Sequence, residues 1–481
     1  MLRELWNRSP TGFAEMRRRS VASSLQRRSS AEVSILYALA LIIGSTIGAL
    51  RAQDATPPPT PVGGLQIRTV SAYAAYYSNA QPAATAVQAG ATNLGSDAEI
   101  GGSAQFAWTK FSDRSSFSLI YTPSYTGRLR YSSVDSLNHT FSFTSNRKIA
   151  PRWNLGFSVT GDLSSIHQTL FTPTILSNVA SVQSSFDDLA SALLAAKFTN
   201  TGLAAVLTSA PLTQSPVSNL LYGERVLTSS AQTTLNYSHS PRLSLTFSVG
   251  ASRNQHISDT QESIPQNGFL LPSTTSGRAS LTVSYSLSPL TQIGGSVSTF
   301  RVSSLLTDTY TTTSLFTLGR TLERRWIVQI RGGMGVTNTV RQAMPFSQPA
   351  TPRPVLGASL GFKTFSHTLI GTYDRTTSDS YGVGASTSFT SNATWQWRRP
   401  GGTWWLDAGL GWQQLQGNAL VRTSGWHTMV GVNHGIGAHV DLRAEYAYLN
   451  YSGALQASAY TFSQNAVRIS VVWNPQPPYT H

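Results

Sequence analysis

The feature that most constrains the fold is an alternation of apolar and polar residues that continues through most of the chain. In residues 243–249 (LSLTFSV) every second side chain is leucine, phenylalanine or valine, and those between are serine or threonine. Residues 153–160 and 440–448 repeat the pattern. Because side chains two apart share one face of a strand, each segment has one apolar and one polar face. Soluble sandwiches also alternate, but they rarely sustain the pattern over so long a chain.

Composition indicates where the two faces lie. Only 12% of the residues are charged, against about 25% in soluble proteins, while mean hydropathy is only -0.12. Glycine, serine, threonine and aromatic residues replace the missing charges. We therefore predict an all-β fold, a transmembrane antiparallel up-and-down β-barrel whose outside meets lipid and whose inside meets water. The chain contains no cysteine, which excludes disulfides, thiolate catalysis and cysteine-based metal sites.

Short polar turns set the expected number of strands. Eight are predicted, near residues 111–115, 146–152, 239–242, 288–290, 321–325, 364–366, 398–402 and 433–437. With single strands near 67–77 and 460–473, they give about 18 strands within a barrel over 67–473. The alternative is 16, because 303–320 and 385–397 are ambiguous. An even number places both chain ends in the periplasm.

The N-terminal region has the features of an export signal. Residues 1–52 combine an arginine-rich start, an apolar run over 33–50 and a cleavage site after Ala52. A single membrane anchor is the competing interpretation, and the true start is Met1 or Met16. A Pro/Thr-rich periplasmic linker is expected over 53–66, and a C-terminal tail over 474–481. These segments predict a bacterial outer-membrane protein.

Removing the signal also lowers the net charge. Residues 1–52 hold 8 of the 35 basic and 3 of the 21 acidic residues, so the net charge falls from +14 to +9. No basic cluster remains, so we expect no nucleic-acid partner. The surplus weakly favours anionic solutes or lipopolysaccharide.

One region breaks the alternation. Residues 165–227 are expected to form a long extracellular loop, with a short helix over 183–197. The helix is rich in alanine and leucine, so it must pack against something. The sequence leaves open whether the loop enters the lumen or covers the mouth of the barrel.

Charged and polar residues on the predicted polar faces are candidates for lining the lumen. They are Gln329, Arg331, Lys363, Asp441, Arg443 and Glu445. A ladder of mixed charges would create a transverse field in an open pore. Equally, these charges would pair with neighbouring strands and fill a closed lumen.

Tryptophan residues mark the expected membrane boundary. Trp153, Trp326, Trp404 and Trp405 each follow a short turn, where an interfacial aromatic girdle would lie, although packing within hairpins is the alternative. Many barrels end on a terminal phenylalanine that the barrel-assembly machinery recognises. Here Trp473 ends the last predicted strand and is the candidate insertion signal.

Enzyme motifs are weak. Residues 357–361 match G-x-S-x-G, but the apolar alternation continues through them, whereas a nucleophile elbow needs a strand-to-helix turn. His239 and Ser240 are adjacent only in a turn, and Asp187-Asp188 suits a helix start. Nine histidines without paired spacing predict no metal site. We expect no catalytic residue, cofactor or metal.

Residues 116–158 contain three distinctive local motifs, a Tyr-x-Pro-x-Tyr strand, an Asn-His pair and an Arg-aromatic hairpin. The residues that form them are Tyr121, Pro123, Tyr125, Asn138, His139, Arg152 and Trp153. In these motifs the chain resembles the β-barrel porin-2 and exopolysaccharide-associated outer-membrane families. The resemblance implies an outer-membrane barrel near polysaccharide-export components, and no catalytic residues.

Three functions follow in order of preference. The first is a passive pore, or a conduit associated with polysaccharide export, with outer-membrane lipid and lipopolysaccharide around it. The second is a structural or adhesive surface protein that does not conduct. The third is a soluble β-rich secreted protein.

Overall fold

A computed structural model describes the strands and the turns that join them. The described residues are 64–79, 95–130, 135–165, 225–257, 273–304, 307–323, 325–341, 348–379, 385–416, 421–437, 439–455 and 458–475. The chain divides into two units, residues 1–60 and 61–481, and every described residue belongs to the second. Within these ranges no helix is long and apolar enough to cross a membrane.

The described part of the chain forms 18 strands of 13 to 16 residues. They are β1 (Gly64–Tyr77), β2 (Asp97–Ser112), β3 (Ser115–Arg128), β4 (Ser136–Ala150), β5 (Trp153–Ser165), β6 (Arg225–Ser238), β7 (Leu243–Ile257), β8 (Thr274–Ser288), β9 (Thr291–Ser304), β10 (Thr307–Leu322), β11 (Trp326–Arg341), β12 (Gln348–Lys363), β13 (His367–Asp379), β14 (Ala385–Arg398), β15 (Trp404–Gln416), β16 (Val421–Ile436), β17 (Val440–Leu455) and β18 (Ser458–Trp473).

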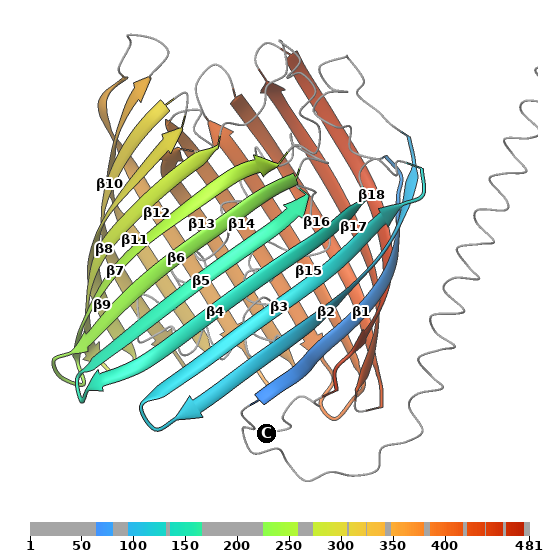
Figure 1. The fold of residues 1–481 in the computed structure, drawn as a ribbon, viewed down its shortest axis with the longest axis horizontal. Helices are drawn as coiled ribbons and strands as arrows, with labels where there is room; N and C mark the ends of the chain where they lie inside the picture. Colours follow the sequence, from blue (N-terminus) through green and yellow to red (C-terminus); the bar gives the residue numbers. More distant parts are fainter. Residues whose placement is uncertain are drawn as a thin grey trace, which may run out of the picture. The chain divides into compact units, whose positions relative to one another are not determined.

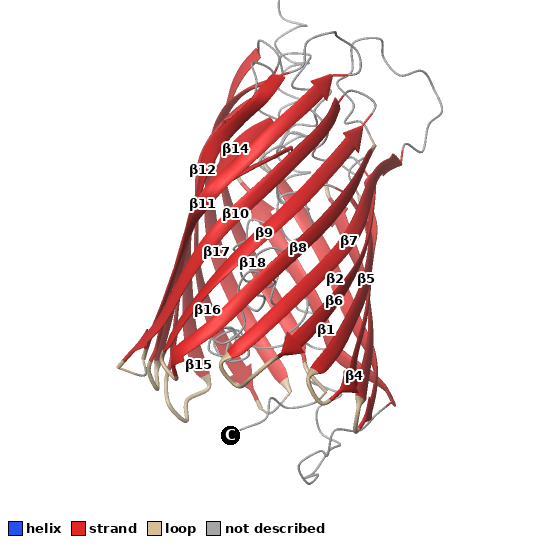
Figure 2. Cartoon of the chain, turned by 90° about the vertical axis from the view of Figure 1, so that its left-hand side faces the viewer, coloured by secondary structure: helices blue, strands red, loops and turns tan. Residues whose placement is uncertain are grey.

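These strands form one closed barrel (Figure 1, Figure 2). Each strand is antiparallel to the next in the chain, as in the Leu243–Tyr285 register of β7 and β8. The last strand returns to the first, where Val70 pairs with Trp473 and Tyr77 with Ala466. This junction of β1 and β18 is called the seam below. The predicted 18-stranded antiparallel up-and-down barrel is confirmed.

All eight predicted short turns join consecutive strands at one end of the barrel. Gly401 and Gly437 have positive φ angles of 64° and 72° in two of them, a conformation that glycine adopts without steric cost. The turn expected at 433–437 lies slightly later, because β16 pairs with β17 up to Ile436. The first strand begins and the last strand ends at this same end, since Val70 pairs with Trp473.

Some expected boundaries shift. β1 begins at Gly64 instead of residue 67, because residues 64–66 already pair with β2, so the last three residues of the expected linker 53–66 belong to the barrel. The ambiguous stretch 385–397 lies within β14, and 303–320 contains the end of β9 and most of β10. The ends of the expected loop 165–227 belong to β5 and β6, and residues 166–224, with the predicted helix, lie outside the described residues.

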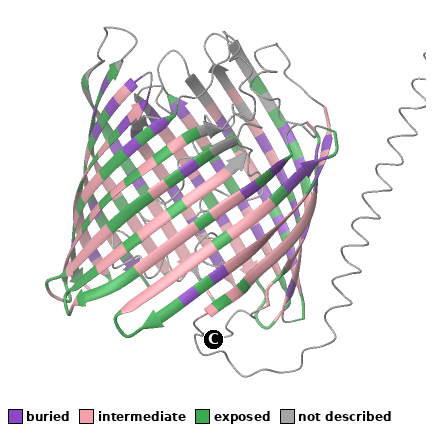
Figure 3. Ribbon diagram, in the orientation of Figure 1, coloured by how far each residue is buried: buried purple, intermediate pink, exposed green. Residues whose placement is uncertain are grey.

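The two faces of each strand differ in exposure (Figure 3). In β2, Ala107 is 1% exposed while its neighbour Trp108 is 38% exposed. The inner face of a closed barrel is concave and shielded, and the outer face is convex and open. The exposed face is therefore the outer one, and it carries large apolar side chains such as Phe247, Leu281 and Ile330.

The apolar outer surface is continuous in the half of the barrel near the short turns, and single exposed side chains such as Leu137 and Val340 lie farther along the strands. In β7 it runs from Leu243 to Val249 and gives way to Arg253. At about 3.3 Å per residue and a tilt of about 40°, such a run covers roughly 20 Å along the barrel axis. An outward apolar band about 25 Å tall is typical of membrane barrels. The remaining length of each strand extends the barrel beyond this band.

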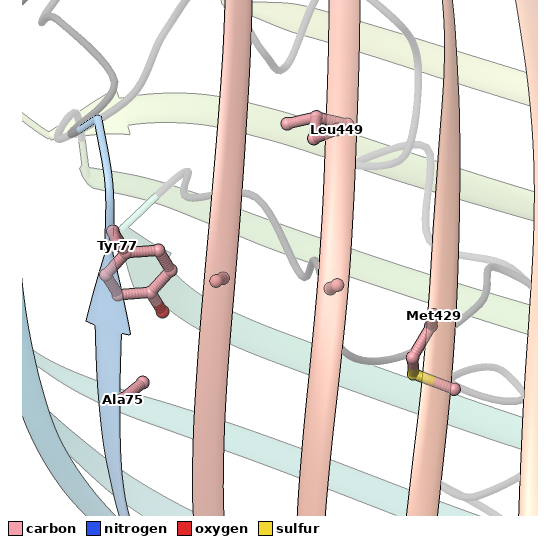
Figure 4. Close-up of a cluster of buried hydrophobic side chains, with 6 residues drawn as sticks. Ala75, Tyr77, Met429 and Leu449 are labelled. Carbon is pink, nitrogen blue, oxygen red and sulfur yellow. The ribbon is translucent and has the colours of Figure 1, made fainter.

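A small apolar cluster lies on the inner face at the seam (Figure 4). Its members are Ala75 and Tyr77 of β1, Met429 of β16, Ala447 and Leu449 of β17 and Ala466 of β18. Each is at most 6% exposed. The cluster packs the first strand against the last three on the side away from the apolar outer surface.

Candidate functional site

Contacts that pass over an intervening strand identify the inner wall. Arg331 of β11 forms an ion pair with Asp374 of β13, over β12. Arg443 of β17 reaches Asp407 of β15 at 2.9 Å, over β16. Side chains converge only on the concave face of a curved sheet. These charged residues therefore project into the lumen.

Glycine makes these contacts possible. Gly357 pairs with Arg331 on one side and with Asp374 on the other, so the three residues form one row. A Cβ atom on Gly357 would lie 2.7 Å from Asp374 Oδ1 and closer still to the Arg331 guanidinium. Gly431 has the same role beside Asp407, whose Oδ2 would lie 2.5 Å from a Cβ. The absence of a side chain leaves room for the ion pair.

The largest charged network begins on β15–β17. The Arg443 guanidinium contacts Glu445 Oε1 at 2.6 Å as well as the Asp407 carboxylate. The Asn433 amide donates a hydrogen bond to Asp407 Oδ1. Glu445 is 5% exposed. A single cation thus stabilises two carboxylates that would otherwise repel each other.

A second group of charges lies on β1–β3. Arg128 contacts Glu99 Oε2 at 2.9 Å and Asp97 Oδ2 at 3.8 Å, and all three side chains are nearly buried. The Tyr73 hydroxyl donates to Glu99 Oε1 at 2.8 Å and lies 3.0 Å from Thr126 Oγ1. Arg128 thus compensates part of the charge of two buried carboxylates.

The strand register joins the two groups across the seam. Asp407, Gly431, Glu445 and Arg468 follow one another in register on β15–β18, and Ala75, Glu99 and Arg128 continue the series on β1–β3. Arg468 lies 4.0 Å from the centre of the Tyr73 ring, a cation–π contact that crosses the seam. We call this series, with Arg443 and Tyr73, the seam row.

The structure places five of the six predicted lumen residues. Arg331 and Arg443 are inward and form ion pairs with carboxylates two strands away, and Arg443 also pairs with inward Glu445 on its own strand. Gln329 accepts a hydrogen bond from Ser359, and Asp441 accepts one from Asn474 at 3.1 Å. The backbone of Lys363 pairs with that of Thr368, and the structure does not describe the Lys363 side chain. The ion pairs of Arg331 and Arg443 reach the second strand along the inner face, and whether these residues line an open or a closed lumen stays a prediction.

Four of the six charged residues of the seam row were not predicted from the sequence. Glu99, Arg128, Asp407 and Arg468 were not singled out, although each stands at an inward position of an alternating strand. A search for charged residues on the polar face of every strand would have found them. Their partners would still have been hidden, because pairing depends on register between strands distant in sequence.

The wall formed by β4–β10 differs in chemistry. Its inward positions carry mostly serine, threonine and asparagine, and hydroxyl groups pair across strands. The pairs include Thr160 with Ser230, Ser248 with Ser280 and Ser252 with Ser276, each at 2.6 Å, and Thr246 with Asn236 at 2.8 Å. We call this surface the hydroxyl wall.

Three charged residues interrupt the hydroxyl wall. Lys148 lies near a short turn, and Asp162 accepts a hydrogen bond from Thr140 at 2.7 Å. Arg278 of β8 lies between inward Ser276 and Ser280, and it is exposed. This wall is therefore nearly neutral along its length.

Three of the four predicted girdle tryptophans lie on the outer face beside the short turns. Trp153 packs on Tyr237 with ring centres 4.5 Å apart, Trp326 on Phe362 at 4.2 Å and Trp404 on His434 at 4.2 Å. Their role as a girdle stays a prediction. Trp473 also faces outward, is 38% exposed and pairs with Val440 and Val70. Its role as an insertion signal is likewise a prediction.

The placement of Trp405 in the girdle is wrong. Trp405 follows Trp404 directly, and adjacent residues of a strand point to opposite faces. It pairs with Arg398 and Asn433, and the Arg398 guanidinium lies 6.0 Å from its ring centre. Trp405 thus lines the inner face next to Asp407.

The residues that carry the family resemblance lie on β3, on β4 and around the start of β5. The Tyr121 hydroxyl and His139 Nδ1 are 2.8 Å apart, and their rings are stacked. Pro123 pairs with His139 and Tyr125 with Leu137 on β4. Tyr121, Tyr125 and His139 face outward, whereas Asn138, next to His139, is buried on the inner face.

The enzyme-like motifs lack catalytic geometry. Residues 357–361 run straight through β12, and Ser359 Oγ donates to Gln329. Ser240 Oγ accepts hydrogen bonds from backbone amides of its turn, while Asp187 and Asp188 lie outside the described residues. No group of three or more His, Asp or Glu residues in the described strands is arranged to hold a metal.

Comparison with known proteins yields similarity in structure alone. No family model matches the sequence, and no curated protein is similar to it. Pseudomonas aeruginosa OpdK with vanillate is 9% identical over 85% of this chain and 97% of its own, with a TM-score of 0.41. Acinetobacter baumannii OccAB4 is 11% identical over 86% and 99%, with a TM-score of 0.42. A bacterial polysaccharide outer membrane secretin is 7% identical over 85% and 98%, with a TM-score of 0.33. At this level of similarity, function must be argued from the walls of this barrel.

Proposed function

We propose that the chain is a passive pore of the bacterial outer membrane. One observation carries the proposal: the closed barrel has an apolar outer band and a hydrophilic inner wall. A soluble β-protein would bury its apolar face, whereas here Phe247, Leu281, Ile330 and Val430 are exposed. Lipid is the solvent that such a surface requires.

The number of strands supports an open lumen. Strands about 4.8 Å apart and tilted by about 40° give an 18-stranded barrel a backbone diameter of roughly 35 Å. Opposite side chains fill only part of that width, and barrels of 16–18 strands leave an aqueous channel. The inner wall would then be in contact with solutes.

Several finer assignments belong to the same proposal. Export by residues 1–52 would bring the chain to the periplasm, where the barrel-assembly machinery would recognise the last strand with Trp473. Outer-membrane lipid and lipopolysaccharide would surround the apolar band. Association with polysaccharide-export components rests on the resemblance over residues 116–158, and no catalytic role is assigned.

Conductance of the purified mature chain, from Gln53, in planar bilayers tests the proposal. We expect stable current steps in KCl from protein that migrates as a heat-modifiable folded barrel. A folded barrel that conducts no ions in repeated reconstitutions would overturn the pore and favour the structural or adhesive surface protein. Protein that washes off vesicles with carbonate would contradict membrane insertion itself.

A further inference from the structure

Two parts of the inner wall, the seam row and the hydroxyl wall, present different chemistry to a solute. In a closed ring of 18 sequentially paired strands, the seam between β18 and β1 faces β9 and β10. The seam row therefore lies opposite part of the hydroxyl wall. A solute in the lumen meets ion pairs on one side and hydroxyl groups on the other.

The hydroxyl wall retains hydrogen-bonding capacity after its own pairs form. A hydroxyl offers one donor and two acceptor positions, so a pair such as Ser248 and Ser280 uses only one donor and one acceptor. The other positions are available to water or to a solute. Similar pairs recur on successive strands, at Thr160–Ser230 and Ser252–Ser276. The wall can therefore exchange water for the hydroxyl groups of a solute at many points.

The seam row gives little attraction to a net charge. Its cations Arg128 and Arg443 each lie between two carboxylates, and Arg468 pairs in register with Glu445. A carboxylate solute entering the lumen loses hydration and must find an uncompensated cation in exchange. Ion pairs still accept and donate hydrogen bonds to neutral diols. Both walls thus favour neutral solutes that carry many hydroxyl groups.

We propose that this lumen selects uncharged polyhydroxylated solutes of the sugar class over organic ions of equal size. The inference rests on the proposed pore function and specifies its solute. Many weak hydrogen bonds along the wall lower the cost of leaving bulk water without trapping the solute. Of the three charged residues on the hydroxyl wall, Arg278 is the exposed cation in mid-strand, and it gives the lumen a small residual preference for anions.

Liposome swelling with three matched solutes tests the selection. Glucose, gluconate and glucosamine have nearly the same size but are neutral, anionic and cationic. For the mature chain we expect glucose to enter several-fold faster than either ion, with gluconate ahead of glucosamine. Equal rates, or faster entry of gluconate than of glucose, would overturn the inference while leaving the pore intact.

Matched threonine variants distinguish wall chemistry from pore size. Thr160→Val, Thr246→Val and Thr282→Val together remove inward hydroxyls at constant volume, and Thr233→Val, Thr299→Val and Thr312→Val remove outward ones. We expect the inward variants to reduce the rate of glucose entry roughly threefold, since each lost hydroxyl removes a weak hydrogen bond. Their KCl conductance should equal that of the parent protein. The outward variants should change neither the rate of glucose entry nor the KCl conductance. An equal effect of both sets would contradict the proposal.

Failure of the proposed pore and failure of the proposed solute class give different results. If the parent protein conducts no KCl, the pore itself fails. If KCl passes but glucose shows no advantage, only the solute class fails. Arg278→Ser should also slow gluconate relative to glucose, and a variant that leaves this ratio unchanged would show that Arg278 has no part in selection.

Discussion

At the scale of single residues, glycine provides the space in which charged side chains form ion pairs over a strand. Gly357 leaves room between Arg331 and Asp374, whereas Gly361, four residues on along the same face of β12, is not crowded. A Cβ on Gly361 would lie 3.8 Å from Ile327, an ordinary contact. A side chain is therefore accommodated at Gly361 but not at Gly357, although both glycines lie on the same face of β12.

We predict that Gly357→Ala lowers the free energy of unfolding by about 1–3 kcal/mol, because the new methyl group displaces the ion pair. Gly361→Ala is the matched control and should be neutral or slightly stabilising, since alanine reduces the entropy of the unfolded chain. Urea titration of the barrel in lipid vesicles measures both. Equal midpoints for the two variants would contradict this account of Gly357.

Arg443 forms ion pairs with two carboxylates, so its removal should change both the stability of the barrel and its ion selectivity. Arg443→Met leaves Asp407 and Glu445 facing each other. We expect a stability loss of about 2 kcal/mol, below the range for fully buried pairs because Arg443 is 33% exposed. The same variant should shift the reversal potential in a KCl gradient towards cation preference.

The matched control for this variant is on the outside of the barrel. Arg301 of β9 forms an ion pair with Asp308 at 2.7 Å, but it lies on the outer face with 55% of its side chain exposed. Arg301→Met removes the same charge without changing the lumen. Its reversal potential should match that of the parent protein, and a shift equal to that of Arg443→Met would argue against a local effect in the lumen.

At the scale of elements, each of the two shortest ladders is crossed by a contact of a charged side chain. Val70–Tyr77 pairs with Ala466–Trp473 at the seam, and Leu356–Lys363 pairs with Thr368–Arg375 between β12 and β13. Every other described pair of neighbouring strands has a longer register. The seam row crosses the first junction, and the Arg331–Asp374 pair lies across the second. Side chains thus reinforce the sheet where backbone pairing is shortest.

We predict that Asp374→Asn accelerates amide hydrogen exchange in Leu356–Lys363 and Thr368–Arg375. The carboxamide loses the charge that holds Arg331 across β12, so this short ladder should open more often. The β10–β11 ladder, with Thr309–Thr339 and Thr311–Thr337 hydroxyl contacts, should be unchanged. Exchange that rises uniformly around the barrel would show that the ion pair does not act locally.

Strands and short turns could be predicted from the sequence because both are local properties. Alternation identifies a face from residues two apart, and turns such as 151–152 combine proline with a following aromatic residue. The partner of Arg331 could not be predicted, because it depends on the registers of β11, β12 and β13 together. Trp405 was wrongly assigned to the outer girdle because only its distance from the turn was considered. Adjacent residues of a strand point to opposite faces, so Trp404 and Trp405 could not both face outward.

At the scale of the whole molecule, neighbouring residues face different solvents. Val283 of β8 is on the outer face and 37% exposed, and Thr282 beside it points inward. We predict that Val283→Arg destabilises the barrel by about 2–4 kcal/mol, the cost of a cation near the middle of the membrane. Thr282→Arg should cost much less and favour anion conductance. The pair is compared by urea midpoint and reversal potential, and equal destabilisation would contradict the assignment of faces.

The seam also determines how this chain can reach its native state. Every other junction closes a hairpin between consecutive strands, but Tyr77 and Ala466 must meet from opposite ends of the sequence. Bringing together two points so far apart along a flexible chain costs about 5 kcal/mol of conformational entropy. The short ladder of β1 and β18, the contact of Arg468 with Tyr73 and the apolar cluster around Met429 must together exceed that cost. A chain that stops before β18 would keep all its hairpins and remain an open sheet with two unpaired edges.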